Sequence, residues 1–102
     1  MSLANATPTK FAVDVHLLLT QSDHVLLSLR QGTFLDGRWN LPSWKVEAGE
    51  NAVTAMVREA REELALELSE DDLTPTTTVQ CRNTFHDVRI GLFFHVEPTP
   101  PC

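Results

Sequence analysis

The chain has 102 residues, of which 42% are apolar and 22% are charged, and its net charge is −6. This length predicts one domain, and this composition is that of a folded protein rather than a disordered one. The negative charge argues against a binder of duplex nucleic acid or of acidic membranes, because both need a basic face. No signal core is present and no apolar run approaches the roughly 18 residues of a membrane span, so we expect a cytoplasmic protein.

The beginning of the chain predicts a β-hairpin. Residues 1–9 are polar and are expected to form a flexible N-terminus. From Phe11 to Leu19, apolar residues alternate with others such as Asp14 and His16, which is typical of a strand with one buried face. After a short turn, His24–Arg30 predicts the returning strand of the hairpin.

A loop and an amphipathic helix are predicted next. Residues 31–40 contain turn-forming glycines and predict a loop, in which Trp39 is expected to pack in the core. Asn51 is the expected N-cap of the helix, because its side-chain oxygen can accept from the first free N–H groups. Apolar residues recur at three- and four-residue spacing, which predicts that one side of the helix docks on a core: Val53, Met56, Val57, Ala60 and Leu64.

The remainder of the chain predicts an acidic turn and two strands. The carboxylates of residues 69–73 lack the spacing of a metal-binding loop, so we expect them to be solvated. Strands are expected over residues 76–83 and 88–96, and the second is apolar enough to be central in a sheet. Cys81 and Cys102 show no CxxC spacing and are expected to be free thiols.

The most informative feature of the sequence is a set of carboxylates on the predicted helix. Glu59, Glu62 and Glu63 are spaced i, i+3 and i+4, so their side chains project from one side of the helix. Close like charges repel one another, and a divalent ion such as Mg²⁺ or Mn²⁺ removes that repulsion because it prefers carboxylate oxygens. The alternative interpretation is a solvated, charged helix face.

The residues around these carboxylates form a longer pattern. Glu50 is followed after seven residues by Arg58-Glu59, and then by Glu62-Glu63 and Leu66. This pattern resembles the signature of the Nudix (MutT-like) hydrolases, which runs Gly, five residues, Glu, seven residues, Arg-Glu-aliphatic-x-Glu-Glu-x-Gly-aliphatic. The resemblance extends over about residues 11–97 and includes the preceding LPSWKVEAGE segment.

The resemblance implies an α+β fold with a mixed sheet packed against the helix of the signature. We expect a single Nudix-like domain over residues 10–97 and a tail over residues 98–102. Family domains continue with another strand and a second helix over the other sheet face, which completes an α/β/α sandwich. From this sequence we expect no counterpart of the second helix. We expect the uncovered apolar surface to favour association into a homo-oligomer or to lower stability. In several family members a further catalytic carboxylate lies in the absent region, and Asp87 and Glu97 are the candidates to replace it.

Two positions depart from the family pattern. Trp44 stands where the signature opens with glycine, so we expect either a reshaped loop or a ring that lies over the pocket. In the family, a loop carbonyl near this point helps to hold the metal, and Ser43 or Trp44 would present it here. Ala65 stands where the signature has its second glycine, which costs about 1 kcal/mol if a left-handed conformation is needed there.

By resemblance, the chain is expected to be a Mg²⁺- or Mn²⁺-dependent pyrophosphohydrolase that acts on a small nucleoside diphosphate derivative. Glu59, Glu62 and Glu63 are the expected metal ligands, and Glu59 or Glu62 also serves as the general base. Arg58 orients the cluster, and Glu50 is either a supporting ligand or the partner of Arg58. Clustered carboxylates disfavour full ionisation without a metal, which suits one of them to act as a base.

Several further residues are expected near the substrate. Ser43 and Lys45 are candidates for contacts with phosphate, and the substrate-pocket candidates are Arg30, Phe34, Arg38 and Trp44. For the charged residues among these, an ordinary solvated side chain is the alternative. The competing interpretation of the whole chain is a truncated Nudix module that binds a nucleotide or a partner without turnover.

Overall fold

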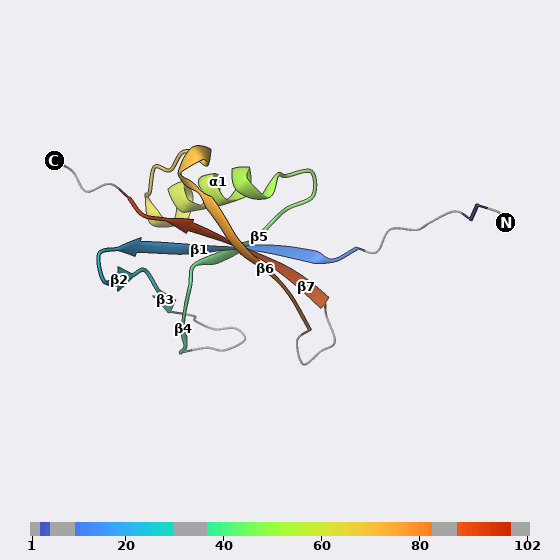
Figure 1. The fold of residues 1–102 in the computed structure, drawn as a ribbon, viewed down its shortest axis with the longest axis horizontal. Coiled ribbons are helices and arrows are strands. Elements are labelled where there is room, and N and C mark those ends of the chain that lie inside the picture. The colour runs from blue at the N-terminus through green and yellow to red at the C-terminus, as the bar shows by residue number, and fades with distance from the viewer. Residues whose placement is uncertain (1–2, 5–9, 30–36, 83–87, 99–102) are drawn as a thin grey trace.

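The computed structural model describes residues 3–4, 10–29, 37–82 and 88–98, and its elements form one mixed sheet, a small second sheet and one α-helix (Figure 1). In chain order, the elements are β1 (Ala12–Gln21), β2 (His24–Val25), β3 (Ser28–Leu29), β4 (Trp39–Asn40), β5 (Ser43–Lys45), α1 (Ala52–Leu64), the 3-10 helix η1 (Glu70–Asp72), β6 (Thr74–Arg82) and β7 (Val88–Val96). This is the α+β fold that the sequence predicts.

The main sheet is centred on β1 and β7, which are parallel to each other. Its order is β2-β1-β7-β6, and β5 also pairs with β1. β1 and β6 flank β7 on either side, so the prediction that residues 88–96 form a central strand is confirmed. β3 and β4 pair only with each other among the described residues and form the second sheet.

The core lies between α1 and one face of the main sheet. Alternate residues of β1, Val15 and Leu17, are fully buried, and Phe94 and Val96 of β7 lie against them. Met56 of α1 is also fully buried in this cluster. The strand period of two and the helical period of 3.6 therefore both bring apolar side chains to one interface, as the alternation and the helical stripe predict.

Both ends of α1 are capped, by Asn51 at its start and by Ala65 at its end. The side-chain oxygen of Asn51 accepts a hydrogen bond from the Val53 N–H at 2.9 Å, so the predicted N-cap is confirmed. At the other end, Ala65 has a φ of 54°, in the left-handed region, and Leu66 N–H donates to Ala60 O at 3.1 Å. The left-handed conformation anticipated at Ala65 is present, at a cost of about 1 kcal/mol for a residue with a Cβ.

The predicted hairpin strand over residues 24–30 is wrong in its extent. His24–Val25 pairs with the end of β1, but Ser28–Leu29 leaves the main sheet and pairs with Trp39–Asn40. The chain therefore divides at Leu26–Leu27 between two sheets. Residues 39–40 are a short strand rather than part of a loop, and Arg30 and residues 31–36 lie outside the described residues.

The expected core packing of Trp39 is also wrong, because its side chain is 64% exposed. Trp39 belongs to the small sheet of β3 and β4, which is separate from the core under α1.

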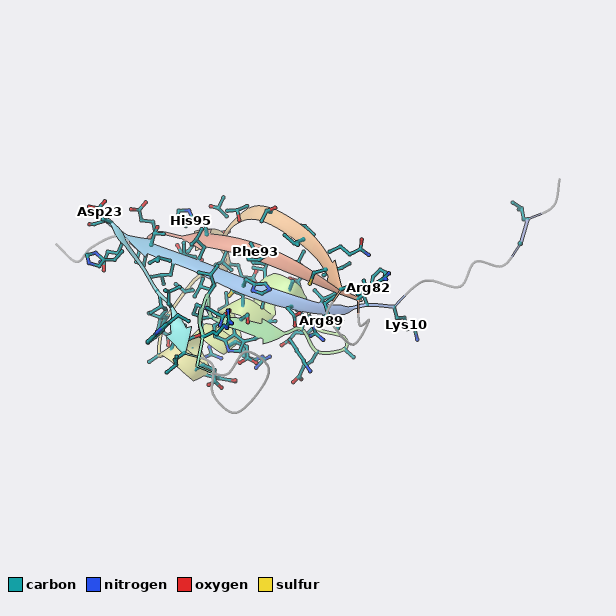
Figure 2. The ribbon with its side chains drawn as sticks, turned by 90° about the horizontal axis from the view of Figure 1, so that it is seen from below. Lys10, Asp23, Arg82, Arg89, Phe93 and His95 are labelled. Atoms are coloured by element: carbon teal, nitrogen blue, oxygen red, sulfur yellow. The ribbon has the colours of Figure 1, made fainter. Side chains whose placement is uncertain are left out.

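The face of the main sheet opposite α1 carries polar and aromatic side chains (Figure 2). Asp14 of β1 forms a two-point ion pair with Arg89 of β7, with N–O distances of 2.6 and 2.7 Å. The rings of His16 and Phe93 are stacked with their centroids 4.3 Å apart. Along β1 and β7, polar and aromatic side chains thus contact one another across the parallel strand pair.

The acidic turn after α1 is the 3-10 helix η1, and it leads directly into β6. Ser69 and Asp72 form a reciprocal capping box at its start. β6 begins two residues before the predicted strand, and the expected turn over residues 84–87 lies outside the described residues. Cys81 is exposed on β6 as a free thiol, as predicted. Among the described residues, no helix is long and apolar enough to cross a membrane.

Candidate functional site

The candidate site is built on the loop that enters α1. β5 pairs with β1, and the ladder continues with a hydrogen bond from Val46 N–H to Val13 O at 2.8 Å. The chain then turns tightly, since Glu50 N–H donates to Glu47 O at 3.0 Å and Glu47 N–H donates to Glu50 Oε1 at 3.2 Å. This turn fixes the carboxylate of Glu50 immediately before the first turn of α1.

Arg58 is the centre of the site. Its Nε and Nη2 donate to the two oxygens of Glu50 at 2.8 and 3.2 Å, which is a bidentate ion pair. Its third nitrogen, Nη1, lies 3.1 Å from Glu59 Oε1 and 3.1 Å from Glu62 Oε2. One guanidinium therefore joins three carboxylates, one from the loop and two from the helix.

These contacts stabilise the charged forms of both partners. The hydrogen bond from Arg58 lowers the pKa of Glu50 below its ordinary value, and the Glu47 N–H lowers it further. The pKa of Arg58 is raised further above its already high value, chiefly by its hydrogen bond with Glu50. At neutral pH the Glu50–Arg58 pair is fully ionised.

The site lies at the protein surface. The side chains of Glu50 and Glu59 are only 17% and 16% exposed, whereas that of Glu62 is 51% exposed. Glu63 is also exposed on the same helix. The arrangement therefore has a partly buried side, held by Arg58, and an open side from which a ligand can approach the carboxylates.

The donor set suits a hard divalent ion, although the carboxylates are not arranged as a metal cage. Oxygens of Glu59 and Glu62 contact the same Arg58 nitrogen, so the two carboxylates lie close together, and carboxylate oxygens are the ligands that such an ion prefers. Within residues 10–29, 37–82 and 88–98, no three His, Cys, Asp or Glu side chains form a group that could hold a metal ion. Glu63 is therefore not gathered with Glu59 and Glu62 into a three-ligand cluster.

The other predicted site residues that the structure describes do not belong to the Arg58 network. Trp44 pairs with Val15 across the β5–β1 ladder and packs against the core, which accounts for the large side chain at this position. Ser43 is half-buried beside it, and Lys45 is exposed. Arg38 is exposed, and its carbonyl accepts from Asn40 Nδ2 at 3.1 Å. Arg30, Phe34 and Asp87 lie outside the described residues, and Glu97 is exposed after β7.

A hollow of about 360 Å³ adjoins the loop of the site, lined by Phe11, Ala12, Val13, Lys45, Val46, Glu47 and Ala48. Of these lining residues, only Lys45 was expected near a substrate. Glu47 is shared between the hollow and the carboxylate cluster, because it lines the hollow and its N–H donates to the carboxylate of Glu50. The sequence does not predict this hollow, because it depends on the pairing of β5 with β1, which is not visible in local sequence patterns.

A family model described as the NUDIX domain matches residues 10–99. The chain belongs to the Nudix family. Members of this family are generally hydrolases that use a divalent metal, and the Glu50, Arg58, Glu59, Glu62 and Glu63 positions are those of its signature. No curated protein sequence matches the chain.

Solved structures show the same fold. A MutT/nudix family protein from Enterococcus faecalis has a TM-score of 0.78 and 19% identity, over 93% of this chain and 39% of that one. A MutT NUDIX hydrolase from Burkholderia pseudomallei has a TM-score of 0.79 and 21% identity, over 91% of this chain and 71% of that one. This chain thus spans less than half the length of the Enterococcus protein.

A third similar structure carries ligands. It is a bifunctional NMN adenylyltransferase/ADP ribose pyrophosphatase from Francisella tularensis, complexed with AMP and a manganese ion. The TM-score is 0.67 and the identity 21%, over 91% of this chain and 29% of that one. At this identity the likeness establishes the fold.

Proposed function

We propose that this Nudix protein hydrolyses the pyrophosphate linkage of a nucleoside diphosphate derivative, such as a nucleoside triphosphate or a nucleotide sugar. The observation that carries the proposal is the Arg58 network, which joins Glu50 of the loop before α1 to Glu59 and Glu62 of the helix. The manganese ion and AMP bound to the Francisella protein support a metal-dependent reaction on a nucleotide.

In this proposal, Glu59, Glu62 and Glu63 would hold Mg²⁺ or Mn²⁺. When bound, the ion supplies charge neutralisation for pyrophosphate oxygens and a lowered pKa for the attacking water. Glu62 is half-exposed and Glu63 is exposed, so small changes of their rotamers can bring their oxygens beside that of Glu59.

Other steps of the proposed reaction are assigned to residues of the chain. Glu50 fixes Arg58 through two hydrogen bonds, and Arg58 in turn positions Glu59 and Glu62. Either Glu59 or Glu62 accepts the proton of the attacking water, since both are carboxylates that Arg58 holds in place. The loop between β5 and α1 leads to a helix N-terminus, which favours the negative charge of a phosphate.

We place the substrate between this network and the adjoining hollow. Ser43 and Lys45 are proposed to meet phosphate groups, and Lys45 also borders the hollow. Arg30, Phe34, Arg38 and Trp44 remain proposals for the substrate pocket. For Trp44 the proposal is limited to its backbone carbonyl, because its ring packs against the core. A cytoplasmic location remains a prediction from the sequence.

A binding module without turnover is the second candidate function. It is favoured by one observation, namely that the described part of the chain contains no ready three-ligand metal group. Arg58 then acts as a permanent counter-ion for the carboxylates, and a nucleotide or protein partner occupies the site without chemistry.

Turnover of a substrate panel separates these two functions. The folded protein is incubated with nucleoside triphosphates, nucleotide sugars and dinucleotides, with Mg²⁺, with Mn²⁺ and with a chelator, and the products are separated by chromatography. The proposal predicts metal-dependent release of a nucleoside monophosphate from at least one compound. Binding of a nucleotide in calorimetry without any product would contradict hydrolysis and support the binding module.

A further inference from the structure

Strand β6 presents an unprotected edge of the main sheet. Within the described part of the chain, β6 pairs with β7 on one side and has no strand on its other side. All nine of its residues are exposed. A free strand edge offers unpaired N–H and C=O groups to another strand, and proteins protect such edges with charges, proline or bulges.

The features that protect this edge lie at the two ends of β6, and its last residue is the charged Arg82. Pro75 and the register shift between Pro75 and Thr77 disturb the start of β6. The segment from Thr77 to Cys81 (TTVQC) contains no charged residue and no proline. Its threonines and valine are β-branched, and such residues are well suited to strand pairing. This second part of β6 is therefore able to accept another strand.

The charges at the two ends of β6 identify the strand that fits. β6 follows directly on the acidic residues Glu70, Asp71 and Asp72 of η1, and it ends with Arg82. Figure 2 shows Arg82 at the end of the sheet. When two copies of β6 pair antiparallel, the Arg82 end of each lies beside the acidic turn of the other, which gives complementary charges twice.

We propose that a second copy of this chain pairs with β6 in antiparallel orientation, around a twofold axis at Thr78. In this register Arg82 of one copy lies opposite Thr74 of the other, and Thr78 lies opposite itself. The pairing is isologous and closes at two copies, because each chain contributes the same edge. The carboxylate cluster on Arg58 plays no part in the interface, so the proposal is independent of hydrolysis.

Sedimentation velocity over a range of protein concentrations tests the charge contacts. Arg82→Glu is expected to weaken the dimer about tenfold, because two equivalent contacts are lost and two repulsions are introduced. Asp71→Arg combined with Arg82→Glu is expected to restore association, because the charges are exchanged and not removed. Asp71 is suitable since its exposed side chain lies outside the capping box of Ser69 and Asp72.

Two results of this experiment would overturn the proposal. A wild-type protein that is monomeric at every concentration has no such interface. A dimer whose dissociation constant is unchanged by Arg82→Glu, or assembly into species larger than dimers, places the contact elsewhere. Circular dichroism of each variant shows that it is folded, so that loss of association is not loss of structure.

Disulfide formation tests the register independently. In a background in which Cys81 and Cys102 are replaced by serine, Thr78→Cys places two thiols opposite each other and is expected to give a covalent dimer under mild oxidation. Gln80→Cys is the matched control, because it lies on the same side of β6 but two residues from the axis. Equal cross-linking of both variants, or preference for Gln80→Cys, would contradict the register.

Discussion

The two faces of the main sheet arise from alternate residues of the same strands, but they are stabilised in different ways. Under α1, Leu17 and Phe94 are buried in a continuous apolar cluster. On the opposite face, Asp14 pairs with Arg89, and Thr20 hydrogen bonds to His95 at 2.7 Å. Burial of apolar side chains therefore stabilises the α1 side of the sheet, whereas specific polar pairs stabilise the other side.

Because the two faces differ in this way, replacing leucine by alanine is expected to lower the free energy of unfolding by unequal amounts at neighbouring positions of β1. Leu17 is fully buried under α1, and Leu17→Ala is expected to lower the free energy of unfolding by about 2–5 kcal/mol, since it removes apolar contacts and leaves a cavity. Urea denaturation followed by fluorescence measures the change.

Leu18→Ala is the matched control, because Leu18 lies next in β1, on the opposite face, and is only half-buried. Its expected cost is about 1 kcal/mol. An equal loss of unfolding free energy in the two variants would contradict this difference, because it would show that both faces of the sheet contribute burial equally.

A smaller effect is expected at the Glu50–Arg58 pair, and it depends on pH. Because the folded pKa of Glu50 is lowered from 4.5, the pair contributes stability above the unfolded pKa and loses it as the pH falls through the folded value. Glu50→Gln is therefore expected to lower the melting temperature at pH 7 by more than at pH 3. A difference between wild type and variant that stays constant with pH would contradict this linkage.

Local patterns in the sequence predict much of the fold. The boundaries of β7 and the cap at Asn51 follow from apolar runs and capping chemistry, which involve only neighbouring residues. The left-handed conformation of Ala65 is anticipated from the position at which the family pattern has glycine. β7 and the N-cap depend on local preferences, so one sequence is sufficient to locate them, whereas the conformation of Ala65 requires the family pattern.

Features that depend on pairing between distant segments are harder to predict from the sequence. The division of residues 24–29 between β2 and β3 depends on competition between β1 and β4 as partners. The exchange of roles between Trp39, which is exposed, and Trp44, which packs on the core, depends on the register of β5 against β1. Aromatic content alone does not distinguish these two positions.

One part of the candidate site follows from local sequence patterns, and another part depends on contacts between distant residues. The helical spacing of Glu59 and Glu62, together with the family signature, is sufficient to place them on one side of α1. That Arg58 contacts both of them and Glu50 at once requires the tight turn at Glu47–Glu50, which only the structure shows.

The proposed site is tested most directly by metal-dependent hydrolysis by wild type, Glu62→Gln and Glu67→Gln, measured on the best substrate of the panel. Glu62→Gln keeps the size of a side chain in the Arg58 network, and it is expected to lower kcat/KM by at least about 100-fold. Glu67→Gln changes an exposed carboxylate beyond α1 and is expected to retain wild-type turnover. Equal activity of all three proteins would contradict the assignment of the site to this network.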